Sequence, residues 1–193
     1  MKKLFVLILI TLGLISIHAE EPFTKISLSG FKVNLIPSAS YSIHIRDSVG
    51  IEKEMEDGIL EIRVLDQTGQ VPKNEITIYT DKLDYLSFHN CQLVMTNSMI
   101  GDSLTLVTAA SFGTLKVNSN YLSVNIGAGS NFKIEGETKF YDCAVGAGST
   151  LQSQRLLAEK ANIDAMGYSN LSFNAKEIIK SEVKNANVKN HYE

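Results

Sequence analysis

The sequence has no tryptophan, only two cysteines among its 193 residues and no cluster of basic side chains. Its formal net charge is −3, and loss of Lys2 and Lys3 with an N-terminal leader would make it more negative. A mildly acidic protein without basic patches is a poor candidate for binding nucleic acid or anionic membranes. No segment repeats apolar residues at helical spacing, which argues against long helices. The positive signals in the chain are those of β-structure.

The first residues predict export. After Lys2 and Lys3 the residues from Leu4 to Ile10 are all apolar, and the apolar stretch then continues with polar residues and glycine in between. It ends before it reaches the roughly 20 apolar residues of a membrane-spanning helix. We therefore predict a secretory signal peptide over residues 1–19, cleaved after Ala19, with a retained anchor as the alternative. No cysteine follows the run, so a lipid anchor is not expected. Residues 20–193 would form one exported domain in the periplasm, at the cell surface or outside the cell, with no stable membrane span.

The second half of the chain contains one turn written nearly twice. The two copies are Ile126-Gly-Ala-Gly-Ser-Asn-Phe132 and Val145-Gly-Ala-Gly-Ser-Thr-Leu151, with Phe132 and Leu151 19 positions apart. Weaker copies occur at residues 87–93, 109–115, 165–171 and 183–188. A short repeat of this kind is typical of stacked structural repeats, and it is clearest over residues 83–193.

Around these turns, apolar and polar residues alternate with the period of two that a half-buried strand requires. When the turns are laid over one another, the inward columns are Leu83, Thr105, Leu122, Tyr141 and Ala161; Tyr85, Val107, Val124, Cys143 and Ile163; and Ser87, Ala109, Ile126, Val145 and Ala165. A polar column would contain Gln92, Thr114, Asn131, Thr150, Asn170 and Asn187. The prediction is an all-β fold, a right-handed parallel β-helix or single-stranded solenoid, with handedness taken from the rule for parallel crossovers. The strands before residue 83 lack the turn and are expected to be irregular.

The same register predicts that the two cysteines are free thiols. Cys143 falls in an inward column, whereas Cys91 falls at a corner with Gly113, Ser130 and Ser149. The two residues lie three coils apart, an axial separation of about 14 Å, whereas a disulfide needs Cα atoms within about 7 Å. We expect Cys143 to be buried and Cys91 to be more accessible.

The order of several segments in the chain resembles that of a known family. A leader, the strand Phe23-Thr-Lys-Ile-Ser-Leu-Ser-Gly30, the segment Glu56-Asp-Gly-Ile-Leu-Glu-Ile-Arg63 and then Gly-Ala-Gly-Ser turns are similar to the head GIN domain of auto-transporter adhesins, which is common in Bacteroidetes. The resemblance covers about residues 23–190. It implies a secreted or cell-envelope β-helix of unknown biochemical activity, and it supplies no catalytic residue.

The chemical motifs in the chain are weak. Gly127-x-Gly129 lacks the third glycine of a dinucleotide site and the Lys-Ser/Thr of a phosphate-binding loop. The turns also lack the carboxylates of calcium-binding β-rolls. His44, His89 and His191 share no metal-ligand spacing. We therefore predict no catalytic residue, no cofactor and no metal.

The function expected from the sequence is that of a non-catalytic surface or envelope module whose repetitive outer face binds a glycan or another envelope protein. The turn aromatics Phe88, Phe112 and Tyr168 are candidate contacts. The alternative is a polysaccharide-active lyase or glycosidase, because Asp142 and Asp164 fall in neighbouring outward positions of adjacent coils. A carboxylate pair about 5 to 9 Å apart can cleave a glycosidic bond. The missing tryptophan and the corner positions of nearby basic residues weigh against this alternative.

Overall fold

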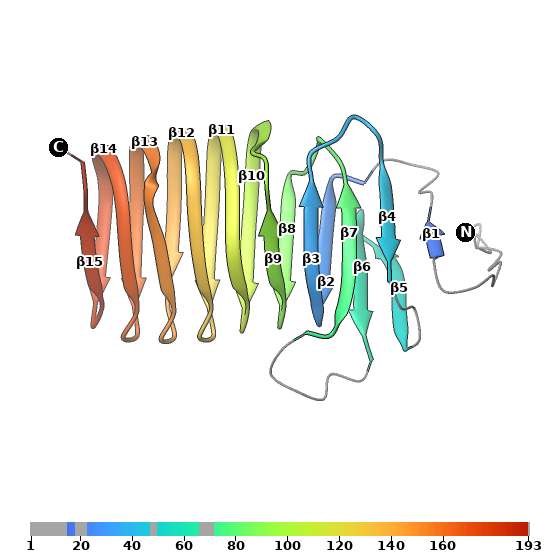
Figure 1. Ribbon diagram of the computed structural model, residues 1–193. Helices are drawn as coiled ribbons and strands as arrows, with labels where there is room; N and C mark the ends of the chain where they lie inside the picture. The colour runs from blue at the N-terminus through green and yellow to red at the C-terminus, as the bar shows by residue number, and fades with distance from the viewer. Residues whose placement is uncertain (1–14, 18–22, 47–49, 66–71, 193) are drawn as a thin grey trace.

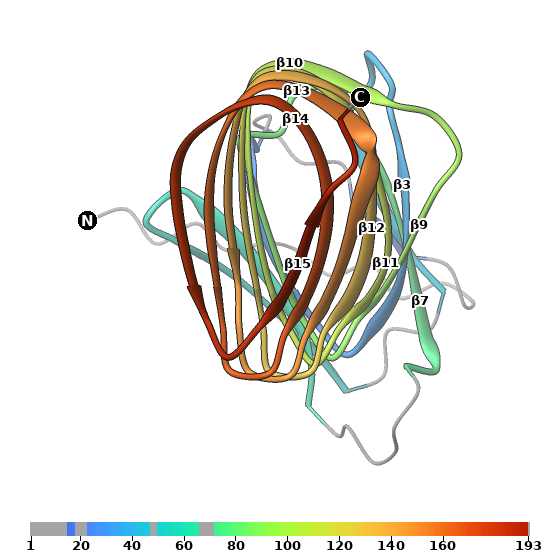
Figure 2. The same ribbon diagram turned by 90° about the vertical axis from the view of Figure 1, so that its left-hand side faces the viewer.

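The computed structural model describes residues 15–17, 23–46, 50–65 and 72–192. Its strands form one continuous 15-stranded sheet that is wound into a column of coils, with β1 and β15 at opposite ends (Figure 1). The column has about five turns, and no helix occurs in the described residues. Seen from the C-terminal end, the chain winds anticlockwise as it advances toward the viewer (Figure 2), so the solenoid is right-handed. The predicted all-β parallel solenoid is confirmed.

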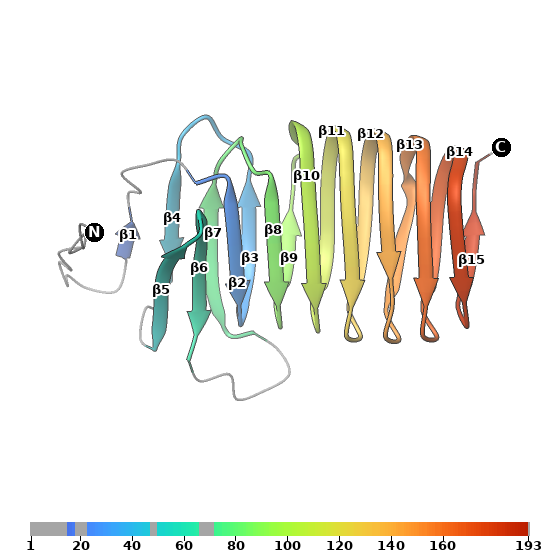
Figure 3. The same cartoon turned by 180° about the vertical axis from the view of Figure 1, so that it is seen from behind.

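The C-terminal part of the column is built from strands that pair only in parallel. They are β8 (Tyr85–His89), β9 (Gln92–Met95), β10 (Met99–Ala109), β11 (Phe112–Gly127), β12 (Asn131–Val145), β13 (Thr150–Met166), β14 (Asn170–Lys184) and β15 (Asn187–Asn190). The long strands bend over a rounded edge and are joined by tight turns at the opposite edge (Figures 1 and 2). We call the sheet formed by their second halves the descending face; it lies in front in Figure 3.

The N-terminal strands are irregular, as expected. They are β1 (Ile15–Ile17), β2 (Lys25–Ser29), β3 (Phe31–Ile36), β4 (Ser42–Ile45), β5 (Ile51–Glu56), β6 (Ile59–Val64) and β7 (Asn74–Tyr79). Strands β2 and β3 continue the parallel stack on β8 and β9, whereas β4 and β5 pair antiparallel with β7 and β6. The change of direction ends the parallel stack on this side. Most of the predicted signal peptide lies outside the described residues; within it, the backbone of β1 pairs with β4.

Columns of apolar side chains fill the interior of the coils. One column runs through Leu86, Leu106, Val124, Cys143 and Ile163, which occupy the same position in successive coils and are all buried. Burying a side chain of this size stabilises the fold by roughly 1.5 to 3 kcal/mol. No coil can bury its own inward face, so each depends on its neighbours along the stack.

The predicted register is correct from Leu122 onward but wrong in the two coils before it. Thr105 pairs with Ser123 and faces outward, while Leu104 and Leu106 fill the interior. The cause is turn length: two residues separate β10 from β11, whereas three residues separate β11 from β12. A shift of one residue moves every side chain of a strand to the other face. The sequence prediction therefore exchanged the inward and outward residues of β8 and β10.

The same slip misplaced two neighbouring columns. Ser111, not Gly113, joins the serine corner, because its amide donates a hydrogen bond to the Ser130 hydroxyl. Phe112, not Thr114, pairs with Asn131 and so interrupts the polar column. Both corrections follow from the shorter turn before β11.

Candidate functional site

Two of the aromatic residues expected to contact a partner remain on the surface, and one does not. Phe88 is 1% exposed, because β8 places it inward opposite Thr108; the prediction that it is a surface contact is wrong. Phe112 begins β11 and is partly exposed, and Tyr168 is 83% exposed in the turn before β14. Phe112 and Tyr168 lie three coils apart, about 14 Å along the stack. The fold does not bring them into one site.

The structure does bring Asp142 and Asp164 together. They line one groove of about 340 Å³ on the descending face, with Asn162 beside them and Lys180 and Glu182 on the next coil. Asp142 pairs with Asn162 across β12 and β13, and Asp164 pairs with Glu182 across β13 and β14. Alternation along β12 and β13 places Asp142, Asn162 and Asp164 outward, because Cys143 and Ile163 between them are buried in the core. We call this hollow the descending groove.

A stacked aromatic pair lies next to the groove. The rings of Tyr121 and Phe140 are 5.5 Å apart and nearly parallel, at an interplanar angle of 8°. The two residues occupy the same position of adjacent coils, one alternation step before Ser123 and Asp142. The Tyr121 hydroxyl donates a hydrogen bond of 3.3 Å to Asp142 Oδ2, which ties the ring pair to the acidic wall.

The electrostatics of Tyr121 follow from this position. Partial burial, followed by the nearby charge of Asp142, raises the pKa of the Tyr121 phenol. Both effects disfavour the phenolate. The hydroxyl therefore stays a hydrogen-bond donor over the neutral range.

Two side chains of the groove each have one polar atom without a hydrogen-bond partner among the described residues. The Oδ1 atoms of Asn162 and Asp164 are shielded from solvent and have no hydrogen-bond partner among the described residues. Shielded polar atoms are normally hydrogen-bonded, because leaving one unpaired costs about 1 to 3 kcal/mol. Beside them Lys180 Nζ lies 2.8 Å from Glu182 Oε1, and this bond raises the pKa of the lysine and lowers that of the glutamate. These two Oδ1 atoms are closed to a ligand as they are to water, so the polar groups that the groove offers are the remaining side-chain atoms of Asp142, Asn162 and Asp164.

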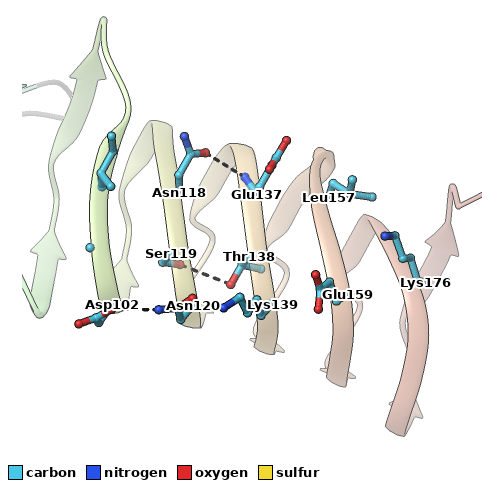
Figure 4. A pocket seen from close by; sticks show the side chains of 12 residues that line it. Asp102, Asn118, Ser119, Asn120, Glu137, Thr138, Lys139, Leu157, Glu159 and Lys176 are labelled. Carbon is cyan, nitrogen blue, oxygen red and sulfur yellow. Dashed lines mark hydrogen bonds between the residues drawn. The ribbon is translucent and has the colours of Figure 1, made fainter.

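A second hollow, of about 600 Å³, lies along the rounded edge (Figure 4). About half of its lining residues are paired with one another along the stack. Asn120 donates to Asp102 at 2.9 Å, Ser119 to Thr138 at 3.4 Å, and Asn118 Oδ1 accepts from the Glu137 amide at 3.1 Å. These ladders hold adjacent coils together, so this hollow is the weaker candidate for a ligand site.

The two thiols are free but offer no reactive nucleophile. Cys143 is buried as predicted, whereas Cys91 is only 1% exposed, so the expectation that it is accessible is wrong. The corner of the coil is closed by the neighbouring coils and not open to solvent. Burial raises the pKa of Cys91 to about 11 and that of Cys143 to about 12. Both remain protonated thiols at neutral pH and react slowly.

No group of three metal-binding side chains occurs among the residues that the structure describes. His44 faces outward, as its position between two buried isoleucines predicts, and packs edge-on against Tyr79 at 5.6 Å. Over the same described ranges, the chain has no helix long and apolar enough to cross a membrane.

Sequence reasoning missed the aromatic pair. Tyr121 and Phe140 carry no motif, and they lie at the start of the descending half, away from the glycine turns that served as the ruler. Their spacing contains the signal: they are 19 positions apart, the repeat length, and so occupy equivalent positions in adjacent coils. The same spacing places the two rings side by side on the outer face.

Solved structures share this fold. A crystal structure of a putative adhesin from Bacteroides fragilis superposes with a TM-score of 0.76 at 16% identity, over 93% of this chain and 98% of the other. A putative lipid binding protein from Parabacteroides distasonis gives 0.58 at 11% identity, over 92% and 95%. A putative adhesin from Parabacteroides merdae gives 0.54 at 12% identity, over 92% and 96%. At these identities the likeness concerns the fold alone.

No curated protein matches the chain in sequence. One family model does match it, over residues 22–189, which is nearly all of the predicted mature chain. The resemblance seen in the early strands and the glycine turns is therefore confirmed. The chain belongs to the family described as "Putative auto-transporter adhesin, head GIN domain".

Proposed function

We propose that this protein is an exported, non-catalytic surface module that binds a glycan chain in the descending groove. The adhesin family supports a surface role of this kind. The groove supports a glycan as the ligand because it combines an apolar ring pair with a small number of oriented polar groups, the usual composition of a small-molecule site. Sugar rings present C–H faces that pack on aromatic rings and hydroxyls that donate to carboxylate and amide oxygens.

The observation that carries the proposal is the junction between Tyr121, Phe140 and Asp142. The two rings stack on one another, so the pair presents its outer faces and edges as an aromatic platform, and the Tyr121 hydroxyl holds the carboxylate of Asp142 beside it. From there the polar side chains of Asn162 and Asp164 follow on the next coil. A linear chain lying across the strands would meet the platform first and these side chains next.

The location of the protein follows from the same proposal. Cleavage after Ala19 would release the domain into the periplasm or to the cell surface, where extended glycans are available. N-terminal sequencing of the exported protein tests this step: a sequence that begins within two residues of Glu20 supports it, and one that begins at Met1 contradicts it.

The experiment that tests the function uses the mature protein and a panel of soluble bacterial and plant polysaccharides. Affinity electrophoresis and calorimetry measure binding, and an assay for new reducing ends measures cleavage. We expect saturable binding of at least one polysaccharide without turnover. No binding anywhere in the panel would contradict the proposal.

One observation favours a second function, that of a glycosidase. Asp142 and Asp164 line the same groove, as a glycosidase requires of its two carboxylates. Against catalysis, Asp142 already accepts the Tyr121 hydroxyl, and the nearby cation Lys180 is paired with Glu182. Turnover in the panel that disappears in both Asp142→Asn and Asp164→Asn would establish the enzyme instead.

A further inference from the structure

The last coil leaves half of its edge open. Strand β15 pairs with Asn170–Phe173 only, so it covers the first half of β14. The second half, residues 176–184, pairs with β13 on one side, and no described strand pairs with its other side. Figure 3 shows this segment as the outermost strand of the descending face. An unpaired edge is a template for another strand.

Two apolar residues of this edge stand at positions that are buried in the preceding coil. Ile178 and Val183 continue the columns of Ala161 and Ala165, which are fully buried one coil earlier. In the last coil Ile178, Ile179 and Val183 are roughly half exposed. The end of the column therefore presents apolar surface beside unused backbone groups.

The direction of those backbone groups can be worked out. The Gly167 amide on the β13 side donates to the Lys184 carbonyl, so the polar groups of Lys184 point toward β13. Successive residues of a strand point their N–H and C=O groups to opposite sides. Counted back from Lys184, Glu182 and Lys180 thus point to β13, and Val183 and Ser181 point to the open edge. The alternation is interrupted at Ile179, where β14 has an extra residue between the partners of Ala161 and Asn162.

We propose that this edge binds a second copy of the same chain, antiparallel, about a twofold axis at Ser181. In this register Ser181 faces the partner's Ser181. Lys180 then lies opposite the partner's Glu182, and Glu182 opposite the partner's Lys180. Opposite charges in directly facing positions stabilise antiparallel pairs.

The charges select this register over its neighbours. Because Ser181 and Val183 point to the open edge, the pairing can shift only in steps that keep odd residues opposite odd residues. One shift places Lys180 opposite the partner's Lys180, and the shift in the other direction places Glu182 opposite the partner's Glu182. Like charges directly opposite one another destabilise a strand pair. A twofold contact also uses up the edge in both copies, so the assembly closes as a dimer.

The other end of the molecule does not offer the same edge. There the parallel stack ends in the antiparallel strands β4 and β5, so a head-to-tail stack would not continue the coils. The charge pattern and the end geometry both favour a symmetric dimer through β14.

The test is sedimentation equilibrium of the mature protein over a wide concentration range, with charge-swap variants. We expect a monomer–dimer equilibrium in the parent protein. Lys180→Glu and Glu182→Lys should each weaken the dimer by about tenfold or more, since both of the symmetry-related pairs become repulsive. The double variant should restore the parent affinity. Lys133→Glu makes the same charge change on an exposed residue of β12 and should leave the dimer unchanged.

Ser181→Pro removes a backbone donor at the centre of the proposed contact and should abolish the dimer, while an edge strand of the monomer tolerates proline. Circular dichroism and thermal melting check that each variant folds, and the charge swaps decide the matter if the proline variant does not. A protein that is monomeric at every concentration overturns the proposal. So does a dimer that withstands the single charge reversals, or one that the double variant fails to restore. Glycan binding is not the readout, so the outcome is independent of the proposed function.

Discussion

The backbone amide of Cys91 donates a hydrogen bond of 3.0 Å to the hydroxyl of Ser111, its neighbour on the next coil. Cys91 occupies the corner position that Ser111, Ser130, Ser149 and Ser169 occupy in later coils. Its thiol contacts the His89 carbonyl at 3.3 Å, just as the Ser111 hydroxyl donates to the Ala109 carbonyl at 2.8 Å. The corner is a buried polar column that closes each turn, and the cysteine is its first polar member.

Cys91→Ser should be tolerated. The hydroxyl can make the bond to the His89 carbonyl that Ser111 makes to Ala109, so we expect a change in unfolding free energy within about 1 kcal/mol. Cys91→Ala loses that bond and leaves a void, and it should be less stable than the serine variant. Urea unfolding measures both. An alanine variant as stable as the serine variant would show that the corner needs no donor.

Two serines of the corner should respond differently to alanine. The Ser130 hydroxyl donates to the Gly127 carbonyl at 2.7 Å and accepts from the Ser111 amide, whereas the Ser149 hydroxyl has no partner among the described residues. We expect Ser130→Ala to cost about 1 to 3 kcal/mol, because it orphans buried groups. Ser149→Ala should be neutral or stabilising. Equal losses in chemical denaturation would contradict the assignment.

Gly136 should not accept a side chain. Its φ of 124° suits glycine, and a Cβ there would collide with the Val117 carbonyl on the preceding coil. At Gly101 a Cβ would meet no described atom within 4 Å, so Gly101 serves as the matched control. We expect Gly136→Ala to destabilise the fold by about 3 kcal/mol or more, and Gly101→Ala to change stability by less than about 1 kcal/mol. Melting temperatures that fall equally in the two variants would show that the close approach at Gly136 is absent.

Alkaline pH should weaken the fold through the thiols. Cys91 ionises near its ordinary pKa of 9.0 when unfolded but near 11 when folded, because burial disfavours the thiolate. Between these values the folded state holds more protons, so stability is complete below pH 9 and falls as the pH rises. The contribution of Cys91 reaches about 3 kcal/mol at most. Cys91→Ser should show a shallower loss of melting temperature above pH 9 than the parent, and parallel pH profiles would refute this cause.

The repeat in the sequence was sufficient to predict the fold, because the Gly-Ala-Gly-Ser turns fix the period and the alternation fixes the face. It was not sufficient to predict the register everywhere. The turn before Phe112 is one residue shorter, and a single-residue step inverts a strand, so Phe88 was assigned to the surface. Cys91 was placed at the correct corner, but neighbouring coils close that corner to solvent. The number of residues in a turn depends on its backbone conformation, which the amino-acid composition does not reveal.

The candidate site was predictable in part. Asp142 and Asp164 were placed in neighbouring outward positions, and they line one groove. The stacking of Tyr121 on Phe140 depends on how two side chains settle across adjacent coils, which the repeat spacing allows but does not determine. The edge of β14 could not be foreseen either, because it depends on where β15 stops covering the coil.

The most direct test of the proposed function is calorimetric titration of the mature protein with the polysaccharide that binds best in the panel. Phe140→Ala and Asp142→Asn should each weaken binding by about tenfold or more, since they remove the platform and a hydroxyl acceptor. Tyr168→Ala, at a more exposed ring outside the groove, should bind as the parent does. If Tyr168→Ala weakens binding while Phe140→Ala leaves it intact, the descending groove is not the glycan site.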